Sequence, residues 1–365
     1  MYTELMKIIE GGLKGDKEKV SNYANVLAEN LKKEGEESIA KRILNIVEAN
    51  NTRMVSLDSF ATKPVDQESR MDIVDIKMPT SISEELVFNK YVNAEVDDFI
   101  KSFEMRDLLR SKGIDVNNTL LLYGPPGCGK TSLAKYISSK AQIPLVTARF
   151  DSLLSSLLGN TAKNIRKIFD YASKRQCILF LDEFDVIAKV RDDKNELGEL
   201  KRVVNSLLQN IDEFSENSIL IAATNHDELL DSAIWRRFHK IIELDKPHDE
   251  QIKQIFEKYS SNFSLDFTLS DKKAEYLMRS VNNLSPADIK VIIQSSIKKA
   301  VMNNKNSLEF IRVMYEVFLF KNHNVNDEDK LINFLNAYGV TQKEIVEFFD
   351  FPVRKVREII SKNKK

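Results

Sequence analysis

The sequence contains only two cysteines and four histidines among its 365 residues. Cys128 and Cys177 cannot form a disulfide framework, and this scarcity is typical of proteins from a reducing compartment. The histidines and cysteines also show none of the spacings that are typical of a zinc site. The sequence therefore argues against a disulfide-rich secreted domain and against a protein built around a zinc ion.

Long apolar runs and a large net charge are also missing. No apolar run reaches the length that crosses a bilayer, and residues 1–13 lack the basic stretch, apolar stretch and cleavage site of a leader peptide. We therefore expect a cytoplasmic protein without a membrane partner. Lysine and arginine total 54 against 55 for aspartate and glutamate, a formal net charge of -1. The chain as a whole therefore has no electrostatic attraction to nucleic acid, although a local basic patch stays open.

The spacing of apolar residues divides the chain into segments of different character. Helical spacing predicts helices near both ends and after residue 249, whereas residues 51–83 lose this periodicity and gain Thr, Ser, Asp and Pro. A chain of this length has room for two or three domains. The predicted order is a helical N-terminal unit (1–50), a linker (51–83), an α/β core (84–245), an all-helical lid (246–322) and a helical C-terminal unit (323–365).

Short apolar runs, most of them separated by helix-length segments, characterise the central part of the chain. Runs of this kind are typical of parallel strands that are buried on both faces. The sequence therefore predicts an α/β fold in which helices cover both sides of a five-stranded parallel sheet, an αβα sandwich. The predicted strands are residues 118–123, 144–150, 176–181, 218–223 and 239–244.

A Gly-rich segment follows the first predicted strand directly and leads into a predicted helix. This is the setting of the P-loop of NTPases, in which backbone N–H groups and the positive end of a helix dipole hold phosphate groups. Lys130 would bridge the β- and γ-phosphates of ATP, and the hydroxyl of Thr131 would bind Mg²⁺. A Gly-rich turn with an incidental lysine is the alternative. The predicted nucleotide-binding residues of this segment are Gly124, Pro125, Pro126, Gly127, Cys128, Gly129, Lys130, Thr131 and Ser132.

Carboxylates follow the third predicted strand. The apolar run 177–181 ends in Asp182 and Glu183, and ligands bind at the edge of a parallel sheet where the carboxyl ends of its strands lie. Asp182 would bind Mg²⁺ through a water molecule as part of the nucleotide site, and Glu183 would polarise the attacking water. An acidic pair at a strand end can also be plain surface charge. Its position downstream of a P-loop favours a role in ATP hydrolysis.

These motifs resemble those of the classical AAA ATPases, and the resemblance extends over about residues 86–320. Residues 219–225 match a further strand of that family, which ends in a polar amide. Asn225 is therefore similar to the family's first sensor, and the resemblance implies that it orients the hydrolytic water.

The prediction that several subunits assemble rests on two arginines. Residues 230–238 are similar to the family's second region of homology, in which Arg236 and Arg237 match the arginine fingers. Fingers of this fold cannot reach the γ-phosphate of their own subunit, so the resemblance implies that they complete the site of a neighbour. It therefore implies a homo-oligomeric ring, and a hexamer as its form. A surface ion-pair cluster beside Trp235 is the alternative.

Other segments agree with the classical branch or depart from it. Residues 284–289 are similar to its lid motif Gly-Ala-Asp-Ile, and no arginine occupies the second-sensor position of clamp loaders. Leu157, Leu158 and Gly159 fall where the family has its pore loop, but Leu157 replaces the aromatic residue. The paired glycines before the first helix of the domain are absent, so the sequence leaves the adenine pocket unassigned.

The last segment resembles a helix-turn-helix unit over residues 338–360. Thr341 is placed as an N-cap, while Val346 and Asp350 replace the alanine and the turn glycine of that motif. The second helix is basic, so it could contact DNA phosphates or a major groove. A small protein-docking or packing module is the alternative, since the same three-helix core serves both uses. The predicted core positions are Ile345, Phe349, Phe351, Val356 and Ile359.

The function implied by the resemblance is ATP hydrolysis by a ring of identical subunits that remodels, unfolds or disassembles a protein substrate or complex. The helical N-terminal unit would then select the substrate or partner. Two alternatives stay open: a DNA-associated motor or loader that uses the C-terminal unit, and an ATP-gated switch that controls a partner enzyme. Some stand-alone AAA proteins that the chain resembles are encoded beside a serine protease and implicated in antiviral defence, which makes a protease one such partner.

Overall fold

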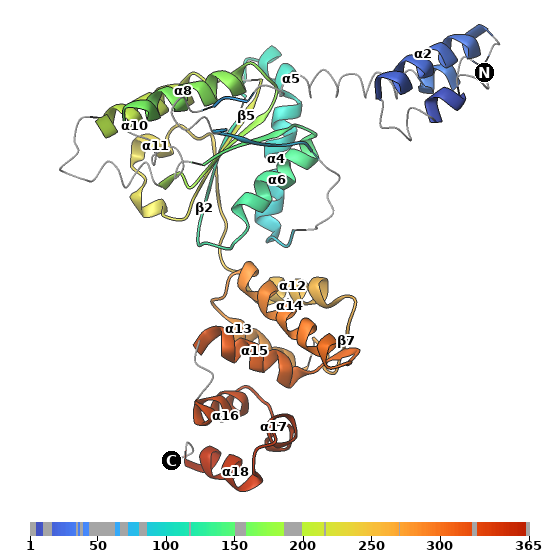
Figure 1. The fold of residues 1–365 in the computed structure, drawn as a ribbon. Coiled ribbons are helices and arrows are strands. Elements are labelled where there is room, and N and C mark those ends of the chain that lie inside the picture. Colours follow the sequence, from blue (N-terminus) through green and yellow to red (C-terminus); the bar gives the residue numbers. More distant parts are fainter. Residues whose placement is uncertain are drawn as a thin grey trace. The chain divides into compact units, whose positions relative to one another are not determined.

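The computed structural model describes residues 5–9, 17–33, 36, 39–43, 63–65, 72–79, 86–116, 118–149, 158–185, 199–214, 217–269, 271–322 and 327–362 (Figure 1). The chain divides into two compact units, Met1–Val65 and Asp66–Lys365. Within these described ranges, no helix has both the length and the apolar character that crossing a bilayer requires.

Most of the described residues of the smaller unit are helical, as the apolar spacing predicted. Helix α2 (Lys17–Lys33) is its main element, and residues 5–9 and 39–43 are also helical. The apolar positions that predict these helices meet in a small core, because an amphipathic helix buries its apolar stripe against its neighbours. The core consists of Leu27, Ala28, Leu31 and Ala40, with Ile8 and Ile43 packed against it.

The larger unit contains the predicted parallel sheet. The side chains of its central strands are almost completely buried, which is why these strands have continuous apolar sequences rather than alternating ones. Five parallel strands lie in the order β3-β4-β5-β2-β6, and the predicted α/β fold is confirmed. They are β2 (Thr119–Tyr123), β3 (Leu145–Arg149), β4 (Ile178–Asp182), β5 (Ile219–Thr224) and β6 (Lys240–Glu243).

The sheet has one strand more than the sequence predicted. Strand β1 (Asp75–Lys77) lies in the range predicted to be a linker and pairs antiparallel with β3, with Ile76 opposite Val146. It forms an edge of the sheet, and Asp75 and Lys77 are exposed and lie 3.6 Å apart as an ion pair. A strand of three residues with two charged positions gives no apolar run, so hydrophobic patterning could not detect it.

Helices cover both faces of the sheet (Figure 1). Helices α4 (Lys90–Glu104) and α6 (Lys130–Ala141) share a hydrophobic core with β2, β4 and β5 on one face. On the other face lie α8 (Leu158–Ser173) and α10 (Glu199–Asp212), which pack on each other. The short helices α5 (Arg106–Ser111) and α11 (Ser232–Trp235) complete this part of the unit. The sheet thus lies between two layers of helices, and the loops that follow the carboxyl ends of its strands remain uncovered by these helices.

The chain after β6 is helical, as predicted. The lid consists of α12 (Asp249–Ser260), α13 (Lys272–Val281), α14 (Pro286–Met302) and α15 (Phe310–Asn322). A short parallel pair, β7 (Ser264–Leu265) and β8 (Ser307–Leu308), lies within the lid. The tail follows with α16 (Glu328–Ala337), α17 (Gln342–Phe349) and α18 (Val353–Lys362).

The segment that resembles a helix-turn-helix unit contains two helices, α17 and α18, joined by a short turn. Thr341 caps α17, and its hydroxyl accepts a hydrogen bond from the Glu344 N–H at 3.2 Å. Asp350 adopts the left-handed conformation, with φ of 56°, at the position where a glycine is usual in this motif. Aspartate tolerates this conformation better than most residues, so the turn forms without the glycine. The predicted core positions Ile345 and Val356 are fully buried.

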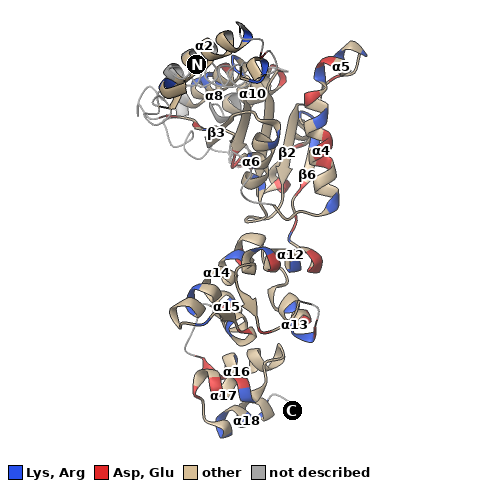
Figure 2. Ribbon diagram, turned by 90° about the vertical axis from the view of Figure 1, so that its right-hand side faces the viewer, with Lys and Arg blue, Asp and Glu red and all other residues tan. Residues whose placement is uncertain are grey.

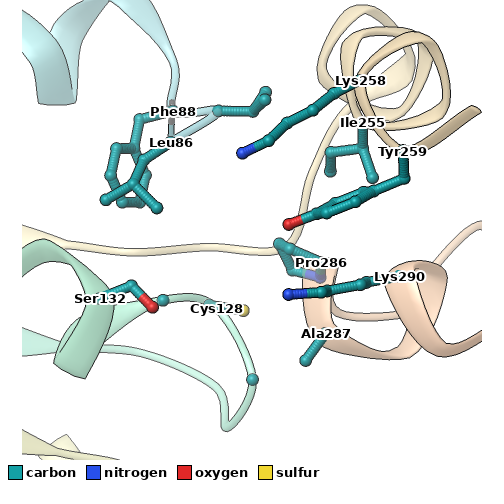
Figure 3. A pocket seen from close by; sticks show the side chains of 13 residues that line it. Leu86, Phe88, Cys128, Ser132, Ile255, Lys258, Tyr259, Pro286, Ala287 and Lys290 are labelled. Atoms are coloured by element: carbon teal, nitrogen blue, oxygen red, sulfur yellow. The ribbon is translucent and has the colours of Figure 1, made fainter. Parts of the chain in front are cut away.

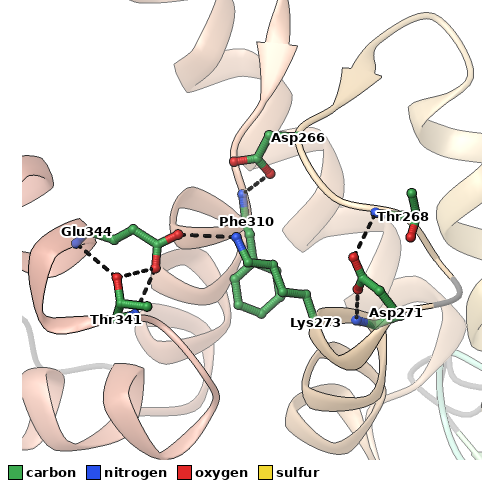
Figure 4. Close-up of polar contacts among 8 residues, drawn as sticks. Asp266, Thr268, Asp271, Lys273, Phe310, Thr341 and Glu344 are labelled. Carbon is green, nitrogen blue, oxygen red and sulfur yellow. Dashed lines mark hydrogen bonds and ion pairs between the residues drawn. The ribbon is translucent and has the colours of Figure 1, made fainter.

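Lid and tail share one hydrophobic core, although the sequence suggested separate units at 246–322 and 323–365. Tyr315 of α15 packs edge-on against Phe349 of α17, with ring centroids 5.0 Å apart. The Lys273 ammonium of α13 forms an ion pair with Glu344 at 3.1 Å (Figure 4). Gly339 has a φ of 82°, and a Cβ atom there would lie 2.4 Å from the Tyr276 ring. The tail is therefore built onto the lid by packing, charge and a close backbone approach.

Candidate nucleotide-binding site

The loop between β2 and α6 has the backbone geometry of a phosphate-binding loop. Gly124, Gly127 and Gly129 all have positive φ, at 131°, 78° and 98°. A Cβ atom at Gly124 would lie 2.3 Å from the carbonyl oxygen of Leu244, so the close approach of β6 also requires glycine. Helix α6 begins at Lys130 with no side-chain cap, so its first N–H groups stay available for an anion.

Lys130 lies at the centre of this loop. Its side chain is only 7 % exposed, and its ammonium donates hydrogen bonds to the carbonyl oxygens of Gly124 at 2.6 Å and Pro125 at 2.9 Å. Burial lowers the pKa of Lys130 below its ordinary value, since the charged form loses hydration. The loop's own carbonyls thus hold the ammonium next to the N–H groups that the glycines expose.

Thr131 and Asp182 provide the oxygen ligands that Mg²⁺ prefers. The Thr131 hydroxyl, at the start of α6, donates a hydrogen bond to the Asp182 carboxylate at the end of β4, over 3.2 Å. The described residues contain no cluster of three or more His, Cys, Asp or Glu that could hold a metal ion. Mg²⁺ in nucleotide sites takes one or two protein oxygens and completes its shell with phosphates and water, so this pair fits that ion.

Glu183 has an unusual backbone conformation for its residue type. Its φ is 56°, in the left-handed region, and its side chain is exposed. Two hydrogen bonds from backbone N–H groups hold it there. Its own N–H donates to the side-chain Oδ1 of Asp182 at 3.1 Å, and the N–H of Phe184 donates to the Ala223 carbonyl oxygen at 2.9 Å. Such conformations cost on the order of 1 kcal/mol and are frequent at functional sites. The fold therefore holds Glu183, with an exposed side chain, directly after Asp182 at the carboxyl end of β4.

Asp185 is a residue of the site that the sequence reasoning left without a role. It is 4 % exposed, and its carboxylate accepts hydrogen bonds from the Thr224 hydroxyl at 3.3 Å and the Asn225 N–H at 3.5 Å. It therefore links the turn after β4 to the end of β5, where Asn225 lies. The sequence did contain a signal for Asp185. It is the third carboxylate of the run Asp182-Glu183-Phe184-Asp185, and the roles assigned to Asp182 and Glu183 leave this third carboxylate unexplained.

The two predicted arginine fingers differ in their surroundings. The Arg237 guanidinium forms an ion pair with Asp212 of α10 at 2.9 Å and donates a hydrogen bond to Ala233 O at 2.6 Å. Arg236 is exposed, and no ion pair or hydrogen bond of its side chain occurs with the part of the chain that the structure describes. Arg237 thus anchors this segment to the domain, while Arg236 presents its charge to solvent.

Trp235 fixes the segment on its other side. Its indole N–H donates to Leu230 O at 3.0 Å, and its ring packs edge-on against Tyr123 at the end of β2, with centroids 5.4 Å apart. The ion-pair cluster considered as an alternative applies to one of the two arginines only.

The predicted pore loop lies partly outside the described residues. Leu157 is not among them, and Leu158 and Gly159 are the first residues of α8.

A cavity of about 200 Å³ lies between the phosphate loop and the lid (Figure 3). Residues 86–88 form its wall before α4, where Phe88 approaches Gly129, and the lid closes it with α12 and the start of α14. The run Leu86-Val87-Phe88 in this wall precedes the first helix of the domain, where the family has its paired glycines. The lining residues are Leu86, Val87, Phe88, Gly127, Cys128, Gly129, Ser132, Ile255, Lys258, Tyr259, Pro286, Ala287 and Lys290.

The lid touches the phosphate loop directly. The Ala287 N–H in the first turn of α14 donates a hydrogen bond to Gly127 O at 3.3 Å. Ser285 caps this helix and lies so close that a Cβ atom at Gly127 would meet its hydroxyl oxygen at 2.4 Å. Gly127 thus permits both the turn of the loop and the approach of the lid.

Gly127→Ala is expected to weaken nucleotide binding by about tenfold or more, because the new methyl group forces lid and loop apart. Isothermal titration with ADP measures the effect. Gly113→Ala is the control, since Gly113 has a similar φ of 73° but nothing within 4 Å of its Cβ position. Ser285→Gly in the Gly127→Ala background should restore part of the affinity. An effect on ADP no larger than that of Gly113→Ala would contradict the contact.

These features define a P-loop nucleotide-binding domain: a strand, a glycine loop around a buried lysine, and a threonine hydroxyl that is hydrogen-bonded to a carboxylate. Residues 120–246 match the family model described as "ATPase family associated with various cellular activities (AAA)". The chain therefore contains an AAA ATPase domain over these residues.

Relatives of the chain carry the same domain. An uncharacterised AAA family ATPase, y4kL, of Sinorhizobium fredii is 39% identical over 210 residues, which are 58% of this chain and 62% of that protein. Proteasome-activating nucleotidase 1 of Haloferax volcanii is 32% identical over 55% of this chain and 51% of its own length. The ribosome biogenesis ATPase RIX7 of Saccharomyces cerevisiae is 32% identical over 52% of this chain and 23% of its own length. The chain thus spans about half to three fifths of the first two relatives.

Proposed function

We propose that the chain hydrolyses ATP with Mg²⁺ in a ring of identical subunits, a hexamer, and uses the energy to remodel, unfold or disassemble a protein substrate or complex. The observation that carries the proposal is the grouping at one sheet edge of Lys130, the Thr131–Asp182 pair and the outward-facing Glu183. A cytoplasmic location belongs to the proposal, and it is consistent with the two buried free thiols.

The proposed hydrolysis uses these residues in separate tasks. Lys130 and the loop N–H groups would neutralise the phosphates, and Thr131 and Asp182, the latter through water, would hold Mg²⁺, which supplies further positive charge. Glu183 would accept a proton from the attacking water, and Asn225, fixed through Asp185, would orient that water.

The neighbouring subunit would supply the remaining positive charge. Arg236 suits this role because its guanidinium faces solvent, whereas Arg237 is already bound to Asp212. In this proposal Arg237 supports the finger by holding its segment against α10. The dependence of one site on the next subunit is the reason for proposing a closed ring rather than a monomer.

A protein substrate is favoured over DNA by the charges of the tail. Lys330, Lys343, Lys355 and Lys362 each form an ion pair with a carboxylate of the same three-helix unit. Figure 2 shows the acidic and basic residues of α16–α18 close to one another. Such pairing leaves less positive charge available for DNA phosphates, so we propose that the tail docks a protein and keep DNA contact as an outcome of the test.

The names of two relatives also support a protein substrate or complex, since they refer to proteasome activation and to ribosome biogenesis.

Stimulation of ATP turnover separates the candidate functions. We expect unfolded polypeptide to raise turnover of the purified chain by about twofold or more through substrate engagement, and duplex DNA to leave it unchanged. The variant Leu157→Ala with Leu158→Ala should keep its basal turnover and lose the stimulation. Stimulation by DNA alone would replace the proposal with the DNA-associated motor. Stimulation only by a co-purified enzyme, such as a protease, would replace it with the ATP-gated switch.

A further inference from the structure

Two aromatic side chains bracket the segment that carries Arg236. Trp235 is the last residue of α11 and directly precedes Arg236, and Phe238 follows two residues later. Trp235 packs edge-on against Tyr123 with ring centroids 5.4 Å apart, and Phe238 packs edge-on against Phe184 at 6.0 Å. Edge-on pairs of this kind have a preferred geometry, so together they define where the segment lies.

The partners of these two rings adjoin residues of the nucleotide site. Tyr123 is the last residue of β2 and directly precedes Gly124, whose carbonyl oxygen accepts a hydrogen bond from the Lys130 ammonium at 2.6 Å. Phe184 directly follows Glu183 and is fully buried. Both aromatic pairs therefore connect the finger's segment to backbone next to the site of the same subunit.

The two pairs differ in burial. Phe184 and Phe238 lie in the interior, 0 % and 4 % exposed, where close packing leaves little room for movement. Tyr123 and Trp235 are only half-buried, so this pair can shift without opening the core. The contact between Tyr123 and Trp235 is thus the point at which a change in the phosphate loop can reach Arg236.

Phosphate binding would act on this contact through Lys130. The ammonium now donates to the carbonyl oxygens of Gly124 and Pro125, and nucleotide phosphates would compete for it with stronger, charge-assisted hydrogen bonds. A weaker hold on the Gly124 carbonyl changes the backbone directly after Tyr123. The support of the Trp235 ring would therefore depend on the nucleotide in the same subunit.

We propose that Trp235 positions Arg236 for the neighbouring subunit, and that its contact with Tyr123 couples this finger to the phosphate loop of its own subunit. The inference rests on the proposed shared site and adds a link between one site and the next. Each subunit would then present its finger in a geometry set by its own nucleotide. Neighbouring sites would hydrolyse ATP in a dependent order rather than independently.

The fluorescence of Trp235 tests the coupling, because this residue is the only tryptophan of the sequence. Titration with ADP, at protein concentrations where ADP leaves the elution volume unchanged, should give a saturable change in emission with its midpoint at the calorimetric Kd. Tyr123→Leu should bind ADP within about twofold of the unaltered chain and lose most of this change. Glu243→Gln removes the partner of the Tyr123 hydroxyl but not the ring, so this matched control should keep it.

Turnover by mixed chains tests the positioning of the finger. Trp235→Leu should lower ATP turnover of the assembled protein by about tenfold or more, because a small displacement of a catalytic group is costly. Mixed with Lys130→Ala chains, which lack a site but keep Trp235, the Trp235→Leu chains should regain turnover by about threefold or more per chain. Trp235→Phe keeps a ring and should retain most of the turnover. Tyr123→Leu in the same mixture provides a second variant.

Each failure has a distinct meaning. Emission that ADP leaves unchanged, or a change that persists in Tyr123→Leu, would remove the coupling. Unaltered turnover by Trp235→Leu would refute the positioning role, and so would a mixture without any gain, which assigns the loss to the chain's own site. Arg236→Ala mixed with Lys130→Ala is the reference: if that mixture also stays inactive, the proposed shared site fails, whereas its recovery alone overturns only this inference.

Discussion

Replacing Arg236 with alanine is expected to lower ATP turnover of the assembled protein by about 10³-fold, the scale on which an arginine finger acts. The guanidinium is exposed and makes no ion pair with the described residues, so its removal leaves no carboxylate unpaired and should not disturb the fold. Nucleotide affinity of the chain's own site should remain, because that site is built from other residues. Phosphate release under saturating ATP and titration with ADP measure the two quantities.

A mixing experiment shows whether Arg236 acts on another subunit. Arg236→Ala chains keep a complete nucleotide site, and Lys130→Ala chains keep their finger, so each is expected to be inactive alone and the mixture partly active. Arg279→Ala, an exposed arginine of the lid, is the control and should turn over ATP as the unaltered chain does. Full turnover by Arg236→Ala alone would refute the shared site. Arg237→Ala should also lower the unfolding temperature, since it leaves Asp212 without its partner.

Glu183→Gln is expected to reduce ATP turnover by about 10²- to 10⁴-fold while ATP still binds, because glutamine keeps the shape of the side chain but cannot accept the proton. The left-handed φ of 56° at this position aims the side chain outward from the end of β4, and glutamine should adopt it as readily as glutamate. Single-turnover phosphate release, with filter binding of radiolabelled ATP, separates loss of chemistry from loss of binding.

The same variant should accumulate the ATP-bound assembly, since hydrolysis no longer releases it. Size-exclusion chromatography with ATP is therefore expected to show a larger species for Glu183→Gln than for the nucleotide-free chain. Glu213→Gln, an exposed glutamate beyond α10, serves as the control for loss of a charge. A monomer in the presence of ATP would speak against the ring, and normal turnover would remove Glu183 from the chemistry.

The sequence predicted the parts of the fold that have strong local signals. Strands β2, β4 and β5 are nearly continuous apolar runs, and glycines occupy the three phosphate-loop positions that have positive φ, so both could be found without a structure. Strand β1 is too short for a periodic pattern and depends on β3 for its hydrogen bonds. Such pairing is a tertiary contact, and hydrophobic patterning does not report it.

Site residues that depend on contacts between distant segments were harder to predict. The cavity joins residues 86–88, the phosphate loop and two lid helices, and the distance between them along the chain hides their proximity. Asp185 is buried and hydrogen-bonded to Thr224 and Asn225, whereas Asp182 is bonded to Thr131, and the sequence alone does not distinguish the two carboxylates. The neighbouring arginines likewise differ through Asp212, which comes from another helix. Sequence motifs identified the chemistry, and tertiary packing distinguished the roles.

The common core of lid and tail has a practical consequence for shortened forms of the protein. Phe318 of α15 packs on Phe334 of α16, and Tyr315 packs on Phe349, so a fragment that stops at Asn322 would expose aromatic rings to water. Apolar patches uncovered in this way promote aggregation. Loss of activity in such a fragment would therefore report a damaged lid rather than a missing binding surface. Point changes on the outer side of α18, such as Arg354→Ala and Arg357→Ala, are the better means of testing what the tail binds.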